Sequence, residues 1–129
     1  MPPCAVIPVL GYEDVGAAID WLCETFGFTE RWRAGDHRAQ LAFGDGAVVV
    51  TERRLVPGPV SLLVRVDDVD SHHAHAVACG ARIISPPEDH IYGERQYSVV
   101  DAGGHSWTFS ESIADVAPEE WGGVSADLG

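Results

Sequence analysis

The sequence of 129 residues is 46% hydrophobic and 22% charged, which excludes a disordered chain and favours one compact domain. Twenty Asp and Glu against eight Lys and Arg give a formal net charge of −12, which argues against binding to nucleic-acid phosphates. The same charge would attract a cationic ligand, or it serves solubility alone.

No apolar run reaches the ~20 residues of a membrane helix, and the N-terminus lacks a signal-peptide pattern. Three cysteines without Cys-x-x-Cys spacing indicate free thiols and a cytoplasmic location.

The first part of the chain predicts a strand, a helix and three further strands. An apolar run at 6–10 is the first strand, Glu13-Asp14 offers a helix cap, and apolar residues at helical spacing continue to Phe26. Gly27 closes this helix. Three strand-like runs follow at 28–33, 37–43 and 47–52, separated by glycine-containing turns.

The second part of the chain repeats this order. After Pro57-Gly58-Pro59, the pattern predicts a strand at 60–66, a helix that begins after Asp67-Asp68 and ends at Gly80, and strands at 82–85, 95–100 and 106–110. The repeat predicts two modules, 1–56 and 57–112, because one module alone would leave an apolar sheet face uncovered. Residues 113–129 are expected to form a tail, as a loop or a short docked turn around Trp121.

Alternation along the strands assigns the two faces of the predicted sheets. One parity is bulky and is expected beneath the helices: Leu10, Val48, Val50, Leu62, Val64, Val66, Trp107 and Phe109. The other is smaller and more polar, and it suits the lining of a partly wet concavity: Ile7, Val9, Ala47, Val49, Thr51, Ser61, Leu63, Ser106, Thr108 and Ser110. The aromatic residues that could present rings to this concavity are Tyr12, Trp32, Tyr92 and Tyr97.

Histidines and carboxylates do not form a recognisable catalytic motif. His72 and His75 share a helix face and could hold a metal, but a structural role is favoured, with His73 toward the core and the other two on a solvated flank. Imidazoles stand next to carboxylates at Asp36-His37 and Asp89-His90, in segments expected to be solvated. No catalytic residue is therefore assigned.

Three stretches carry a resemblance to a known family. They are Val64-Arg65-Val66-Asp67-Asp68-Val69, Ala78-Cys79-Gly80-Ala81, and the segment from Tyr92-Gly93-Glu94-Arg95 to Asp101-Ala102-Gly103-Gly104-His105. With them, residues 5–112 resemble the vicinal oxygen chelate superfamily of glyoxalase I, extradiol dioxygenases and bleomycin resistance proteins, although Ala102 replaces the usual proline. The resemblance implies an α+β fold in which two tandem βαβββ modules form a curled mixed sheet around a cup, with helices on the outer face.

The resemblance also implies where a metal would bind in the metal-dependent members. Carried over, those four positions are Ile7, Val49, Ser61 and Thr108. A catalytic metal needs at least three N, O or S donors, and this set does not supply them. We therefore expect neither a metal nor another cofactor.

The closest pattern is that of the bleomycin resistance branch, which implies a metal-free protein that sequesters a planar or amphipathic antibiotic and confers drug resistance. The resemblance implies a homodimer with shared or domain-swapped clefts, and Arg95 is expected to orient the ligand or to pair with an acid. The expected ligand-binding residues are Trp32, Val49, Ser61, Leu63, Tyr92, Arg95, Tyr97 and Thr108. An alternative is a glyoxalase-like lyase, isomerase or other enzyme with a relocated or absent metal that uses His37, Glu94 or His90. A third is a scaffold whose only partner is a second chain.

Overall fold

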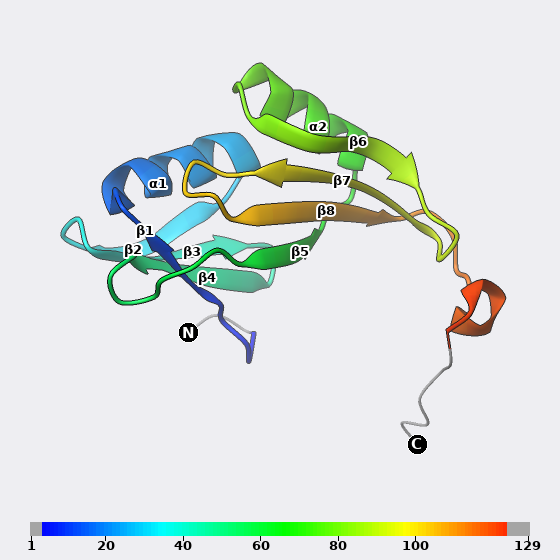
Figure 1. Cartoon of the computed structure of the whole chain (residues 1–129), viewed down its shortest axis with the longest axis horizontal. Helices are drawn as coiled ribbons and strands as arrows, with labels where there is room; N and C mark the ends of the chain where they lie inside the picture. The colour runs from blue at the N-terminus through cyan, green and yellow to red at the C-terminus, as the bar shows by residue number, and fades with distance from the viewer. Residues whose placement is uncertain (1–3, 124–129) are drawn as a thin grey trace.

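The structure is a computed structural model that describes residues 4–123, so the last six residues of the predicted tail lie outside it. Its first module contains β1 (Val9–Tyr12), α1 (Val15–Trp21), a π-helical turn η1 (Leu22–Phe26), β2 (Thr29–Ala34), β3 (Arg38–Phe43) and β4 (Gly46–Glu52). Its second module contains β5 (Ser61–Arg65), α2 (Val69–Ala78), β6 (Arg82–Asp89), β7 (Glu94–Val100) and β8 (Ser106–Ser112). A 3₁₀ turn, η2 (Pro118–Trp121), follows and projects away from the body (Figure 1).

Each module builds one four-stranded mixed sheet, with the same topology in both. Sheet A has the order β1-β4-β3-β2 and sheet B the order β5-β8-β7-β6, and in each the first and last strands of the module are parallel. The predicted two-module α+β architecture is therefore confirmed. Within the described residues no strand of one sheet pairs with a strand of the other.

The two helices begin at the predicted caps. The carboxylate of Asp14 accepts a hydrogen bond from the Ala17 amide at 3.0 Å, and that of Asp68 accepts one from the Ser71 amide at 3.1 Å. Gly27, with φ of 88°, ends the first helix in the left-handed conformation that glycine favours. No helix in the described part is long and apolar enough to cross a membrane.

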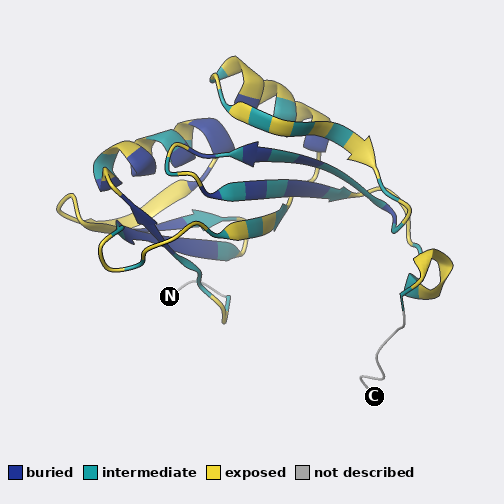
Figure 2. Ribbon diagram, viewed as in Figure 1, coloured by how far each residue is buried: buried dark blue, intermediate teal, exposed yellow. Residues whose placement is uncertain are grey.

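One apolar core joins the modules. The bulky side chains of the strands lie beneath the helices as predicted. Phe26 at the end of η1 packs across the module boundary against Trp107 and Phe109, with ring centroids 5.3 Å and 4.8 Å apart. Strands β4 and β8 are the most buried parts of their sheets, whereas β2 is exposed throughout (Figure 2). The smaller, more polar parity of each sheet consequently faces away from this core.

A buried polar network around Asp101 ties the second module to the first. One oxygen of the Asp101 carboxylate accepts hydrogen bonds from the Tyr12 hydroxyl at 2.5 Å and the Trp107 indole at 2.9 Å, and the other accepts from the amides of Gly103 and His105. His105 is 1% exposed, and its Nε2–H donates to the Gly11 carbonyl at 2.8 Å. Burial, with the Asp101 charge as a second cause, raises the pKa of Tyr12 far above its usual range.

Candidate functional site

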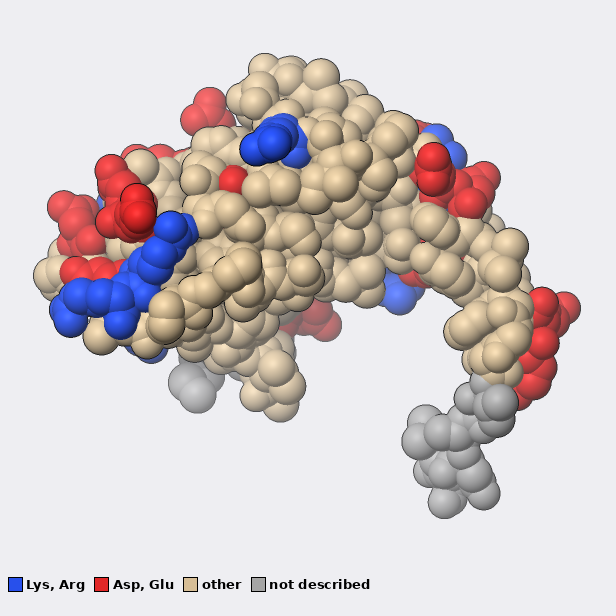
Figure 3. All heavy atoms as spheres, viewed as in Figure 1, with Lys and Arg blue, Asp and Glu red and all other residues tan. Residues whose placement is uncertain are grey.

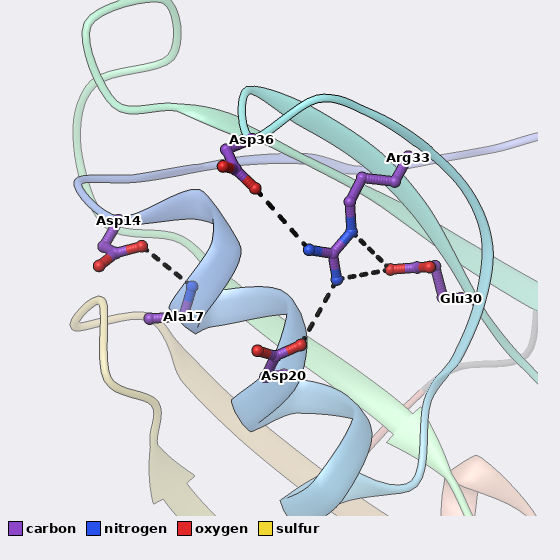
Figure 4. Close-up of polar contacts among 6 residues, drawn as sticks. All are labelled: Asp14, Ala17, Asp20, Glu30, Arg33 and Asp36. Carbon is purple, nitrogen blue, oxygen red and sulfur yellow. Dashed lines mark hydrogen bonds and ion pairs between the residues drawn. The ribbon is translucent and has the colours of Figure 1, made fainter.

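In each sheet we call the face turned away from the helices the outer face. That of sheet A carries one of the predicted aromatic residues, Trp32. Arg33 on β2 reaches Asp20 of α1 at 3.4 Å and pairs with Glu30 and Asp36, so its side chain lies on the helix side of the sheet (Figure 4). Neighbouring residues of a strand point to opposite faces, which places Trp32 on the outer side. We call this the Trp32 face; its residues stand in one register line across the sheet, namely Val9, Val49, Gln40 and Trp32.

The outer face of sheet B is rich in hydroxyl groups. Ser61 and Ser106 lie 3.0 Å apart between their Oγ atoms, and Ser98 Oγ lies 2.9 Å from Thr108 Oγ1. Leu63 pairs with Thr108 in the register and is 61% exposed. We call this the hydroxyl face; its residues are Ser61, Leu63, Arg65, Glu94, Gln96, Ser98, Ser106, Thr108 and Ser110.

A chain of hydrogen bonds runs along the hydroxyl face and ends on a carboxylate. The Tyr92 hydroxyl donates to Gln96 Oε1 at 3.0 Å, Gln96 Nε2 donates to Ser110 Oγ at 3.1 Å, and Ser110 donates to Glu94 Oε1 at 2.8 Å. Arg65 approaches the same Glu94 oxygen at 3.5 Å. Tyr92 donates its hydroxyl hydrogen to Gln96, so the lone pairs of its oxygen remain as acceptors.

Two predicted ligand-binding residues lie on the other side of sheet B. Tyr97 pairs with Phe109 in the register, is 0% exposed, and belongs to the core. Arg95 shares its parity and bridges Asp70 of α2 at 3.0 Å and Asp89 of β6 at 2.9 Å. Placing them in the concavity was therefore wrong, because residues 95 and 97 alternate with the outward residues 94, 96 and 98. The alternative role expected for Arg95, an ion pair with acidic residues, is the one observed.

The remaining predicted residues fall into two groups. Ser61, Leu63 and Thr108 belong to the hydroxyl face, and Tyr92 joins it through Gln96. Trp32 and Val49 lie on the Trp32 face of the other sheet. Glu94, Gln96 and Ser98 also lie on the hydroxyl face and were not among the predicted ligand-binding residues. Strict alternation along 94–100, counted from the bulky core residues of the paired strand, would have identified all three.

The histidines of α2 have structural partners. His72 hydrogen-bonds to Tyr97 and to the Phe26 carbonyl, and His75 to the Glu24 carbonyl at 2.8 Å. The structural role favoured from the sequence is thus the one observed, but the expected solvated position of His72 is wrong, since it is half-buried between the modules. Burial lowers the pKa of His72, partly opposed by its bond to the Phe26 carbonyl.

The residues at the family's metal positions do not fit a divalent ion. Ile7 and Val49 carry no donor atoms, and the hydroxyls of Ser61 and Thr108 are neutral and already bonded to neighbouring hydroxyls. A site of the open catalytic kind needs three or more converging donors such as imidazole, thiolate or carboxylate. No group of three His, Cys, Asp or Glu side chains with that arrangement occurs among residues 4–123.

The candidate acid–base groups do not converge on one place. His37 lies in the exposed β2–β3 turn, whereas His90 stacks on Tyr92 with ring centroids 5.0 Å apart. Glu94 is engaged by Ser110 and Arg65. Among the described residues, no hydrogen bond or ion pair joins the side chains of these three residues to one another.

Two of the cavities at the module boundary lie near the start of α2 and near β5. The larger, about 580 Å³, lies between the end of η1 and the start of α2 and is lined by His72, His75, Asp45 and Asp68 among others. The smaller, about 260 Å³, lies between β4 and β5 and includes Leu63, Arg65 and Val48. On the face shown in Figure 3, Arg atoms form separate small clusters, among them one near the upper middle of the molecule, and not the continuous stripe that phosphate binding favours.

Comparisons with known proteins agree with the fold. Residues 6–109 match the family model described as Glyoxalase/Bleomycin resistance protein/Dioxygenase superfamily. TioX from Micromonospora sp. ML1 is 32% identical, with a TM-score of 0.75 over 88% of this chain and 100% of that one. TnmS3, described as an antibiotic binding protein from Streptomyces sp. CB03234, is 25% identical, with a TM-score of 0.70 over 84% and 97%.

A further relative is a protein of Mycobacterium tuberculosis. The uncharacterized protein Rv0887c of Mycobacterium tuberculosis is 25% identical, and the match covers 90% of this chain and 79% of the relative. The family-model match spans most of both modules and coincides with the paired sheets described above. The chain belongs to the glyoxalase/bleomycin resistance protein/dioxygenase superfamily.

Proposed function

We propose that this protein binds a planar or amphipathic small molecule of the antibiotic type and sequesters it without chemical change. The observation that carries the proposal is the character of the two outer faces. At the positions where the resemblance implies an ion, these faces carry aliphatic and hydroxyl groups, of which Val49 is buried in the single chain, beside an exposed Trp32 and Leu63. Such surfaces supply contact area and hydrogen bonds to a ligand but no activated water.

The proposed binding unit is a homodimer. In one chain each outer face turns away from the shared core, so a single copy does not enclose a ligand between them. Two copies that bring the Trp32 face of one chain opposite the hydroxyl face of the other would give each ligand an apolar wall and a hydrogen-bonding wall, twice per dimer. Tyr92, with its free lone pair, would accept a hydrogen bond from the ligand.

The similarity to TnmS3 supports the ligand class, because that protein is described as antibiotic binding. The net charge of −12 would favour a cationic member of this class. The cysteines Cys4, Cys23 and Cys79 are all free thiols, which fits a reducing compartment, and the proposal places the binding, and the resistance it would confer, in the cytoplasm.

Tryptophan fluorescence and thermal-shift titrations against planar, cationic and peptide antibiotics test this function. We expect at least one compound to quench the fluorescence saturably, to raise the melting temperature, and to be recovered unchanged in mass after dissociation. The same affinity should remain after dialysis against a chelator. A compound recovered in altered form, or binding that is lost with removal of Zn, Ni, Fe or Mn, would instead support the enzyme alternative.

A further inference from the structure

Two imidazoles of α2 meet the end of the first helix. The last carbonyl groups of a helix lack partners within it and need donors from elsewhere. His75 Nε2 lies 2.8 Å from the Glu24 carbonyl oxygen, and His72 Nε2 lies 2.9 Å from that of Phe26. Because a carbonyl only accepts, each ring carries a hydrogen on Nε2. The second module thus caps the π-helical end of the first.

The other ring nitrogen of His72 is also engaged. Nδ1 lies 2.5 Å from the Tyr97 hydroxyl oxygen. With hydrogen on Nε2, the neutral ring can only accept at Nδ1, so the Tyr97 hydroxyl donates. Tyr97 is fully buried, and this is the one hydrogen bond of its hydroxyl within the described residues. His72 therefore links η1 of the first module to β7 of the second through one neutral tautomer.

The surroundings of His72 disfavour a positive charge on the ring. Its centroid lies 4.0 Å from that of Phe109, 6.1 Å from Phe26 and 6.3 Å from Phe43. Burial is the main reason that the pKa of His72 is lowered. The titratable and charged groups that face it, along α2 or across the larger cavity, are Asp45 of the β3–β4 turn, Arg65 of β5, Asp67 and Asp68 at the α2 start, His73 and His75 of α2, and Tyr97 of β7.

We propose that His72 is a proton-sensitive latch that joins the two modules while its imidazole is neutral and loosens them when it is protonated. A proton on Nδ1 would face the hydrogen of the Tyr97 hydroxyl. That hydroxyl would have to turn and leave its own hydrogen buried without an acceptor, which is unfavourable. The charge would also lie against the ring of Phe109. Both effects act at the boundary between the modules.

The direction of the pH effect follows from the lowered pKa. The unfolded chain takes up a proton at His72 near the ordinary value of about 6.5, whereas the folded chain takes it up only at lower pH. Stability from this residue is therefore complete above that value, falls as the pH decreases below it, and levels off once the folded form is also protonated.

Denaturant unfolding of wild type, His72→Gln and His37→Gln from about pH 7.5 to about pH 5 tests the latch. Glutamine offers an NH₂ donor group and a carbonyl acceptor without titrating, and His37 is an exposed control in the β2–β3 turn. We expect the unfolding equilibrium constant of wild type to rise on acidification by about fivefold more than that of His72→Gln, with His37→Gln behaving as wild type. The buried His105 is unchanged in all three proteins. Parallel curves for wild type and His72→Gln would overturn the proposal.

Histidine NMR on the unaltered protein gives a second readout that does not depend on a variant folding. The His72 signal is expected to show hydrogen on Nε2 at neutral pH and to titrate below the ordinary range. Tyr97→Phe, which removes the donor to Nδ1, should shift that titration toward higher pH. Titration of His72 at or above the ordinary value, or hydrogen on Nδ1, would refute the latch.

Discussion

Strand parity separates the aromatic side chains into two groups with different consequences for substitution. Tyr97 lies with Trp107 and Phe109 in the core, whereas Trp32 is 42% exposed on the outer face of an edge strand. Removing the first therefore acts on folding, and removing the second acts on whatever binds to the Trp32 face.

We expect Trp32→Ala to weaken binding of the ligand found by titration by about 1–3 kcal/mol, because an exposed indole supplies contact area mainly to a partner. Its melting temperature should stay near that of wild type. Tyr97→Ala should lower the free energy of unfolding by about 3–5 kcal/mol, as truncation of a buried aromatic side chain does. Fluorescence titration and denaturant unfolding measure the two effects. Unchanged affinity in Trp32→Ala would remove this residue from the site.

Asp101 is the residue on which the polar link between the modules depends. Asp101→Asn replaces one acceptor oxygen by an amide NH₂ group, which would face the donors of Tyr12 and Trp107 or the amides of Gly103 and His105. We expect a loss of about 3 kcal/mol in the free energy of unfolding, because hydrogen bonds to charged groups contribute about 1.5–3 kcal/mol each. The exposed Asp115→Asn is the matched control in urea unfolding. Equal stability of both variants would contradict this role.

At the scale of elements, the end of the first helix differs from the sequence prediction. Helical spacing predicts a regular helix to Phe26, and the residues from Leu22 to Phe26 instead form a π-helical turn. The wider turn changes which carbonyls the helix end presents, and α2 meets two of them with His72 and His75. The two histidines lie 46 and 51 residues from these carbonyl groups along the chain. The periodicity within the first helix therefore does not predict these contacts.

The segment after β8 is attached to the β6–β7 connection at Gly93. The amides of Ile113 and Ala114 both donate to the Gly93 carbonyl, and a Cβ at Gly93, where φ is 85°, would meet the Ala114 carbonyl oxygen at 2.3 Å. Nearby, the rings of Tyr92 and Trp121 lie 5.8 Å apart. A short turn that includes Trp121 is present as η2, and its contact with Tyr92 lies beside the point where the tail joins Gly93.

We expect Gly93→Ala to destabilise the protein more than Gly44→Ala does. Both residues have positive φ, but nothing lies within 4 Å of a Cβ placed at Gly44. The loss of stability in Gly44→Ala therefore contains only the backbone penalty of about 1 kcal/mol. Any further loss of stability in Gly93→Ala measures the clash with the tail. Thermal unfolding compares the two, and protease cleavage after residue 112 should increase only in Gly93→Ala. Equal melting temperatures would show that the tail is not held there.

At the scale of the whole molecule, the proposed dimer makes a prediction for exposed apolar residues. Leu63 on the hydroxyl face is 61% exposed and Val77 on α2 is 51% exposed, so they are similar in a single chain. Leu63→Glu should bury an unpaired charge in the dimer and dissociate it, while Val77→Glu should leave it intact.

Sedimentation equilibrium checks this difference. Wild type and Val77→Glu are expected at twice the 13.8 kDa mass of the chain, and Leu63→Glu at the mass of one chain. Loss of the dimer in Val77→Glu alone would move the interface to α2. A monomeric wild type that still binds ligand would separate the binding function from the dimer.

The sequence by itself determined the module repeat, the caps at Asp14 and Asp68, the glycine that ends the first helix and the bulky parity that forms the core. These depend on local spacing and alternation, which neighbouring residues specify without the rest of the chain. The tertiary structure alone decided that Arg95 lies between Asp70 and Asp89, and that Glu94, Gln96 and Ser110 join in one chain of hydrogen bonds. It also placed His72 between two modules. Such contacts bring together groups far apart in sequence, and their energy exists only once the sheets and helices have packed.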